Sequence, residues 1–208
     1  TGTENVAIGM QALDASGAGT DGSYNVAIGN DALGANTEGQ FNVGVGRRAL
    51  YANTTADENT AVGYLSLYAN TTGATNVAVG VSALQENTTA SNNTAVGNRA
   101  LTANTTGYNN TVVGSQSTDA NTTGHSNTAV GRVSLTANTT GDQNIAVGVS
   151  ALEANTTASN SVAIGNNALA VSTTQGNLTA VGHQALAANT SGDSNTAVGY
   201  LALTASTT

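Results

Sequence analysis

Residues 59–75 read NTAVGYLSLYANTTGAT, and a unit of this form recurs along the whole chain. The unit begins at residues 5, 25, 42, 59, 76, 93, 110, 127, 144, 161, 178 and 195, which makes twelve units. We number positions within the unit from its first residue, position 0, and call the residues that share a position a column. Units start 17 residues apart, except that the first interval is 20, which places a three-residue insertion near residues 17–19. A period without drift indicates that every unit occupies the same place in a repetitive fold.

The first half of the unit indicates a short strand that ends in a corner. Position 1 is always β-branched, position 3 is always Val or Ile, and position 4 is always Gly. Because side chains alternate along a strand, positions 1 and 3 share one face. Position 8 is Leu in every unit except the one with Thr118, and it is out of phase with that face, so Gly must supply a bend. We predict a core made of positions 1, 3 and 8.

The second half of the unit indicates a turn. Most units carry Asn-Thr-Thr-Gly or a close variant from position 11, and these residue types favour turns. No stretch between glycines has room for three helical turns, and Thr, Val, Asn and Gly are weak helix formers. The sequence therefore predicts an all-β fold, a parallel β-solenoid (β-roll) of twelve coils with 17 residues per coil, in a single domain over residues 1–208.

Composition excludes several classes of function. The chain of 208 residues has no Cys, no Pro and no Trp, and its net charge is -8 with only four Arg and no Lys. Nucleic-acid binding needs a basic stripe, so we expect no nucleic acid as a partner. No apolar run approaches the roughly 18 residues of a membrane span, so we expect no membrane insertion.

The sequence does not indicate an enzyme. His125 and His183 lie at positions 15 and 5, about three coils apart, with no repeated carboxylate beside them. Most acidic residues are scattered over the columns, so neither a metal site nor a Ser/His/Asp set is implied. We expect a non-enzymatic protein without catalytic residues, metal or cofactor.

The columns of small residues predict a contact surface. Position 2 is Ala in ten units and position 4 is always Gly, whereas exposed columns normally vary. A uniformly small face favours close approach of a second copy of the chain; the alternative is a narrow solenoid that accepts only small residues at its bends. The candidate self-association face consists of Ala61, Ala78, Ala95, Ala129 and Ala146.

The asparagines at position 11 have two interpretations. Eight of them form an Asn-x-Thr/Ser triplet of the glycosylation type, and stacked Asn and Thr side chains could also satisfy the backbone of the turns. Repetition in register favours the ladder over a sugar-coated fibre. The candidate glycosylation residues are Asn53, Asn70, Asn87, Asn104, Asn121, Asn138, Asn155 and Asn189.

Two other kinds of binding are weaker hypotheses. Exposed Tyr suits carbohydrate, which makes Tyr64, Tyr200, Tyr51 and Tyr68 candidate ligand-facing residues, although scattered Tyr is also typical of a solvated face. Ice binding would need Thr at alternating positions of one flat strand. The fullest Thr columns are the adjacent positions 12 and 13, and the Thr at position 1 shares its column with Val and Ile of the predicted core.

Two stretches carry a family resemblance. Residues 25–29 and 161–165, Asn-Val-Ala-Ile-Gly and Ser-Val-Ala-Ile-Gly, resemble the head repeats of trimeric autotransporter adhesins. Residues 59–64 and 195–200, both Asn-Thr-Ala-Val-Gly-Tyr, more closely resemble repeat regions of phage tail-fibre-like proteins. The resemblance implies a left-handed parallel β-roll, commonly trimeric, that serves as a shaft or adhesive head. The 17-residue coil is longer than the usual adhesin-head unit.

These observations lead to one expected function. The chain is expected to be a structural fibre or adhesive shaft, extracellular or on a virion, that associates with itself as a homotrimer or an end-to-end filament. A solenoid scaffold that binds a cell-surface glycan, a host receptor or ice is the alternative.

Overall fold

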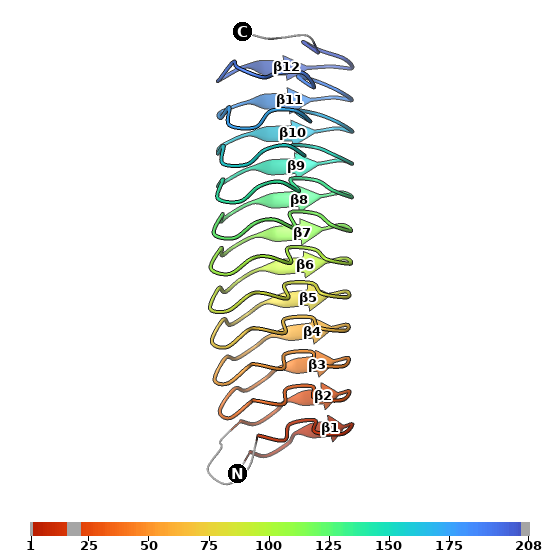
Figure 1. Ribbon diagram of the computed structural model, residues 1–208, viewed down its shortest axis with the longest axis vertical. Coiled ribbons are helices and arrows are strands. Elements are labelled where there is room, and N and C mark those ends of the chain that lie inside the picture. The colour runs from red at the N-terminus through yellow and green to blue at the C-terminus, as the bar shows by residue number, and fades with distance from the viewer. Residues whose placement is uncertain (1, 16–21, 205–208) are drawn as a thin grey trace.

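The computed structural model describes residues 2–15 and 22–204 and shows one rod-shaped β-solenoid (Figure 1). Twelve parallel strands of three residues form a single sheet in chain order, one strand per coil. The strands are β1 (Val6–Ile8), β2 (Val26–Ile28), β3 (Val43–Val45), β4 (Thr60–Val62), β5 (Val77–Val79), β6 (Thr94–Val96), β7 (Thr111–Val113), β8 (Thr128–Val130), β9 (Ile145–Val147), β10 (Val162–Ile164), β11 (Thr179–Val181) and β12 (Thr196–Val198). The predicted fold class is confirmed. The predicted insertion near residues 17–19 lies outside the described residues.

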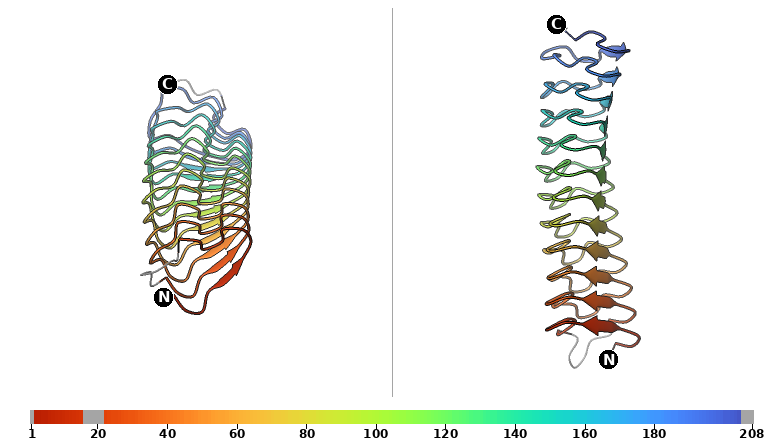
Figure 2. Two further views of the ribbon diagram at one scale, coloured as in Figure 1. Left: turned by 60° about the horizontal axis from the view of Figure 1, so that its bottom comes forward. Right: turned by 90° about the vertical axis from the view of Figure 1, so that its right-hand side faces the viewer.

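Every strand pairs with the strand of the next coil in the register that the repeat predicts. Val43 pairs with Thr60, for example, and Val45 with Val62, so each column is stacked along the rod axis. The strands run to the right at the back of the rod in Figure 1, and the chain returns across the front as it climbs (Figure 2). The solenoid is therefore left-handed.

The glycine at position 4 makes the corner, as predicted. All twelve of these glycines have φ between 131° and 147°, a backbone conformation that L side chains rarely adopt. Stacking adds a second restriction, because a Cβ on Gly114 would lie 2.2 Å from the carbonyl oxygen of Gly131 in the next coil. A side chain at this position would meet the backbone of the next coil everywhere except at Gly199 in the last coil.

The predicted core is correct at position 8 and wrong at positions 1 and 3. Leu84 is fully buried, as the prediction requires, and so is Ala61 at position 2, whereas Val62 at position 3 is 36% exposed. The inside of the coil leaves little space between the strand and the leucine column. A Cβ on Gly44 would lie 3.4 Å from Cγ of Leu33, so the strand can offer little more than a methyl group to the leucine. Val and Ile therefore point outward.

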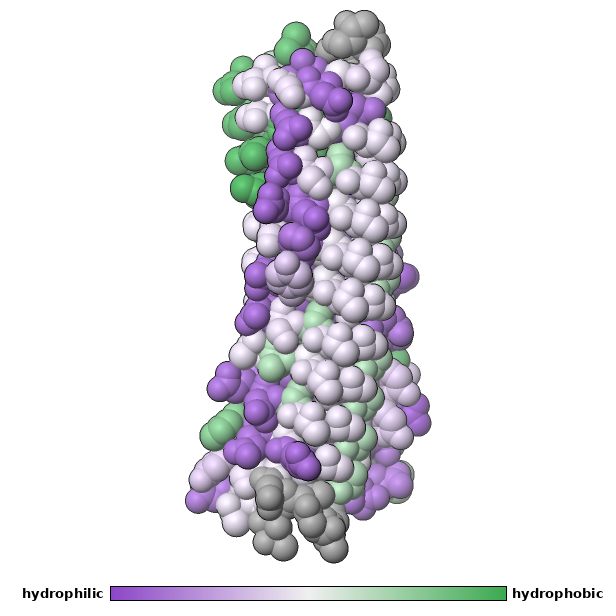
Figure 3. Space-filling model, turned by 90° about the vertical axis from the view of Figure 1, so that its left-hand side faces the viewer, coloured by the Kyte–Doolittle hydropathy of each residue, from purple (hydrophilic) through white to green (hydrophobic). Residues whose placement is uncertain are grey.

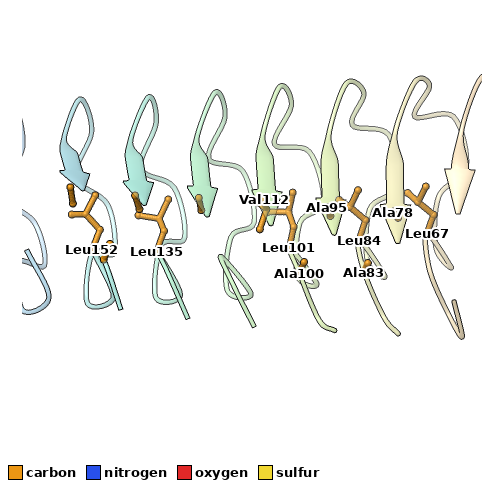
Figure 4. Close-up of a cluster of buried hydrophobic side chains, with 14 of the residues drawn as sticks. Leu67, Ala78, Ala83, Leu84, Ala95, Ala100, Leu101, Val112, Leu135 and Leu152 are labelled. Atoms are coloured by element: carbon orange, nitrogen blue, oxygen red, sulfur yellow. The ribbon is translucent and has the colours of Figure 1, made fainter. Parts of the chain in front are cut away.

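One coil shows how tightly the inside is filled. Figure 4 shows Leu67, Leu84 and Leu101 directed at the strands that carry Ala78, Ala95 and Val112. Val112 is larger than the usual alanine, and its own unit has Thr118 in place of the usual leucine. Both residues are fully buried. Val112 faces Leu101 of the preceding unit, so at this level the interior holds a valine and a leucine, both fully buried.

Two asparagine ladders complete the interior. At position 0, the backbone N–H of Asn42 donates to Oδ1 of Asn25 at 2.9 Å, and its side-chain amide donates to the carbonyl of Ala56 at 2.8 Å. At position 11, Nδ2 of Asn53 donates to Oδ1 of Asn36 at 2.9 Å and to Ala56 at 3.0 Å. Buried amides need such partners, so the ladder interpretation of the Asn columns is confirmed.

Candidate interaction surface

An apolar surface of the rod is the outer face of the sheet, which we define as the side chains at positions 1 and 3 of β1 to β12. In the inner coils these side chains are part-buried or exposed; Val113 is 38% exposed and Ile164 is 40% exposed. No charged residue occurs at positions 1 to 3 of any unit. The outer face is therefore a continuous uncharged strip of Val, Ile and Thr.

The dimensions of the outer face follow from its register. Eleven intervals between twelve strands give a length of about 53 Å, at about 4.8 Å per interval. Positions 0 to 4 span a width of about 13 Å, at about 3.3 Å per residue. The strip thus covers about 700 Å², more than soluble monomers usually expose in one apolar patch.

The two long borders of the outer face differ in charge. The border after the strands, at position 5, carries Arg47, Arg132 and His183 and no acidic residue. The border before the strands, at positions 15 and 16, carries acidic residues and one base, His125, whose Nε2 lies 3.3 Å from Oδ2 of Asp142. The acidic residues of this border are Glu4, Asp57, Glu58, Asp142 and Asp193.

The remaining two arginines are held within the chain. Nε of Arg48 lies 3.2 Å from Oδ2 of Asp31, and Nη2 of Arg99 lies 3.2 Å from Oδ2 of Asp119. The hydrogen bond with Asp31 raises the pKa of the Arg48 guanidinium. Within the described part of the chain, neither Arg47 nor Arg132 has such a carboxylate partner.

The predicted self-association face is wrong. All five of its alanines are fully buried inside their own chain, because position 2 faces the leucine column. The small residues reflect the narrow interior, which was the alternative interpretation. The residues of this prediction are Ala61, Ala78, Ala95, Ala129 and Ala146.

The candidate glycosylation asparagines are also inside the coil. Nδ2 is the atom that would carry a glycan, and in Asn87 it donates to Asn70 at 2.8 Å and to Ala90 at 3.0 Å. A glycan at such an atom would require the turn to open. The asparagines that are fully buried in this way are Asn53, Asn70, Asn87, Asn104, Asn121, Asn138, Asn155 and Asn189.

The candidate ligand-facing tyrosines all lie in stacks with a neighbouring coil. The rings of Tyr51 and Tyr68 are stacked with centroids 5.4 Å apart, and Tyr200 is stacked on His183 at 5.5 Å. The guanidinium carbon of Arg47 lies 5.7 Å from the centre of the Tyr64 ring. The stacks explain how the rings are held, and a ligand role for them stays a prediction.

The threonines of the turns form another regular surface. At position 12, Oγ1 of Thr71 donates to the carbonyl of Thr88 at 3.0 Å, and most threonines of this column do the same. At position 13 the threonines are exposed. Figure 3 shows this side of the rod, where pale, weakly polar residues stack in a column along the axis.

Groups of three or more His, Cys, Asp or Glu that could hold a metal ion do not occur among residues 2–15 and 22–204. The same residues contain no helix long and apolar enough to cross a membrane.

The fold and its surfaces define a tandem-repeat β-solenoid protein. Comparisons of the chain with protein-family models, with curated proteins and with solved structures gave no match.

Proposed function

We propose that the chain is a structural rod, the shaft of an extracellular or virion fibre or adhesin, which assembles with further copies of itself through the outer face. The observation that carries this proposal is the uncharged strip of Val, Ile and Thr that follows the rod along its full described length. Exposed apolar strips of this extent are typical of protein interfaces. The resemblance to tail-fibre-like and adhesin-head repeats supports the same function.

The size of the outer face fits a stable assembly. Specific interfaces bury about 800 Å² per partner, and the strip supplies about 700 Å² before its borders are counted. Its side chains stand in straight rows, because every strand has the same register with the next. Such a surface is complementary to a second copy of itself, which has the same rows.

Ice binding is the second candidate function, because one structural finding favours it. One argument from the sequence against ice binding is that the threonines at position 1 lie in the predicted core. In the structure they face outward, and Thr111 is exposed. Position 3 carries only Val or Ile, however, so hydroxyl groups occupy one row at most. Self-association therefore accounts for the outer face better than ordered water does.

The experiment compares two triple substitutions. In the first, Val79→Lys, Val96→Lys and Val113→Lys place three charges on the outer face. In the matched control, Thr72→Lys, Thr89→Lys and Thr106→Lys place the same charges on the exposed turns. Sedimentation velocity should show an oligomer for the unmodified chain and the control, and a folded monomer for the outer-face variant. A monomeric unmodified chain at micromolar concentration would refute the proposal, and ice-recrystallisation inhibition lost only in the outer-face variant would favour ice.

A further inference from the structure

We propose that copies of this chain associate side by side in parallel and in register, with the basic border of one copy against the acidic border of the next. The inference rests on the proposed self-association through the outer face and adds the orientation of the copies. The observation behind it is that basic residues on one border and aspartates on the other occur in the same units of the repeat.

The charges on the two borders vary together from unit to unit. Position 5 is basic in three units, at Arg47, Arg132 and His183, and position 15 is Asp in the same three units. Those aspartates are Asp57, Asp142 and Asp193, and the column has no other aspartate. Residues that vary together are usually in contact, and here the twelve units act as an internal alignment.

The paired charges cannot meet within one chain. Arg47 follows the end of β3, whereas Asp57 precedes the start of β4, so the strand and the corner separate them by about 20 Å. In Figure 1 the strands end towards the right of the rod, and the turns that precede them lie on the left. The charges within each pair differ in height by only about 3 Å, which is the fraction of one coil rise between residues ten apart. The pairs can therefore form only between copies at the same level.

A local role explains only part of the pattern. Oδ1 of Asp57 accepts the backbone N–H of Gln40 at 2.7 Å, and Asp193 does the same for Gly176 at 2.9 Å. Serine serves as well, since Oγ of Ser91 accepts the N–H of Ala74 at 3.0 Å. An uncharged oxygen at position 15 is thus sufficient to accept this backbone N–H, and the negative charge of Asp is not needed for it.

The orientation follows from symmetry. When two rods face each other in parallel, related by an axis along the rod, the border at position 5 of one lies beside the border at positions 15 and 16 of the other. A ring of three or more parallel rods produces the same contact, which is heterologous. In an antiparallel pair the basic border would lie against itself, and like charges would repel. The charge pattern therefore favours every parallel arrangement over the antiparallel one.

Cysteine cross-linking tests the orientation directly, because the chain has no cysteine of its own. Ile28→Cys lies on β2 and Val181→Cys lies on β11, equally far from the two ends of the sheet, so an antiparallel pair that overlaps along its full length would place them opposite each other. With a short bis-maleimide, each variant alone should form covalent dimers. An antiparallel pair would leave each variant uncross-linked alone and give dimers only when the two are mixed. That result, obtained with an assembled protein, would overturn this inference and leave the proposed function intact, whereas a monomeric protein would remove both.

Charge reversal tests the contact itself. Arg47→Glu should weaken assembly at least tenfold in sedimentation equilibrium, because it places like charges on facing borders. Adding Asp57→Arg to Arg47→Glu should recover most of the loss. The position tolerates the change, since the same column carries Ala74 and Tyr108 in other units. Gln85→Glu, which adds one negative charge away from both borders, is the control and should change the affinity less than twofold. Failure of the double variant to recover would contradict the proposed pairing.

Discussion

The position 0 asparagine ladder is continuous through coils β2 to β9 and interrupted at β10 and β11. From Asn25 to Asn144, each side chain accepts the backbone N–H of the next coil at 2.9–3.1 Å. At the interruption, Ser161 and Leu178 take the place of asparagine. The N–H of Leu178 still donates to Oγ of Ser161 at 3.3 Å. The leucine side chain, however, has no acceptor for the backbone N–H of Asn195.

The second ladder is interrupted in the same region. Ser172 replaces asparagine at position 11, and Oδ1 of Asn155, one coil earlier, is left buried with no hydrogen-bond partner in the described structure. In the intact part of this ladder, Oδ1 of Asn121 accepts a hydrogen bond from Nδ2 of Asn138 at 2.8 Å. The comparison shows that each amide depends on the coil that follows it, so a substitution in one coil leaves an unsatisfied group in another.

The largest effect is expected where the ladder is intact. Asn93 accepts from the backbone N–H of Asn110 at 3.0 Å and donates to the carbonyl of Gly107 at 2.9 Å. Asn93→Ala leaves the buried N–H of Asn110 without an acceptor and removes one of two donors to the Gly107 carbonyl, which keeps Nδ2 of Asn104 at 2.9 Å. The free energy of unfolding should therefore fall by about 2–4 kcal/mol, measured by urea denaturation.

A matched substitution at the end of the rod should have much less effect. Among the described residues, the side chain of Asn195 makes one long hydrogen bond, to Oδ1 of Asn189 at 3.3 Å, and it is partly exposed. Asn195→Ala should therefore lower the free energy of unfolding by less than about 1 kcal/mol. Equal effects for Asn93→Ala and Asn195→Ala would show that the ladder is not the source of the difference.

Repair of the first ladder should give a smaller gain of the opposite sign. The double substitution Ser161→Asn and Leu178→Asn provides acceptors for residues 178 and 195, at the loss of the buried leucine side chain. We expect a net stabilisation of about 1–2 kcal/mol and slower hydrogen exchange of amides in β11 and β12. Unchanged exchange in these strands would contradict the expectation.

The smallest effect should come from the second ladder. Ser172→Asn offers Nδ2 to the unpaired Oδ1 of Asn155, which should stabilise the fold by about 1 kcal/mol. Because the neighbouring Val171 is exposed, Val171→Asn serves as a control for the added amide and should leave the melting temperature nearly unchanged.

Much of the fold is predictable from the sequence, because repetition reveals structure column by column. The period, the glycine corner, the buried leucine and the asparagine ladder each follow from the residue types that a column permits. Which face of the strand points into the coil is not predictable in the same way. Alternation shows that positions 1 and 3 share a face, but it does not show which face is inside, and burial preferences favour Val over Ala. The close approach of Leu33 to Gly44 reverses that preference.

The candidate interaction surface depends on the same distinction. The bases at position 5 and the aspartates at position 15 are visible in the sequence, yet their relation is not. Once Val62 and its equivalents are known to face outward, Arg47 and Asp57 become the two borders of one strip. The Tyr51 and Tyr68 stack also required the structure, because position 9 varies and gives no periodic pattern.

The constant register has a consequence for how such a rod changes its length. Each coil contacts only the coil before it and the coil after it, and all coils share one cross-section. Duplication or loss of one 17-residue unit in the gene would therefore lengthen or shorten the rod by about 4.8 Å without disturbing the remaining coils. The number of repeats therefore sets the length of the rod, and recombination between repeats in the gene changes that length in steps of one coil.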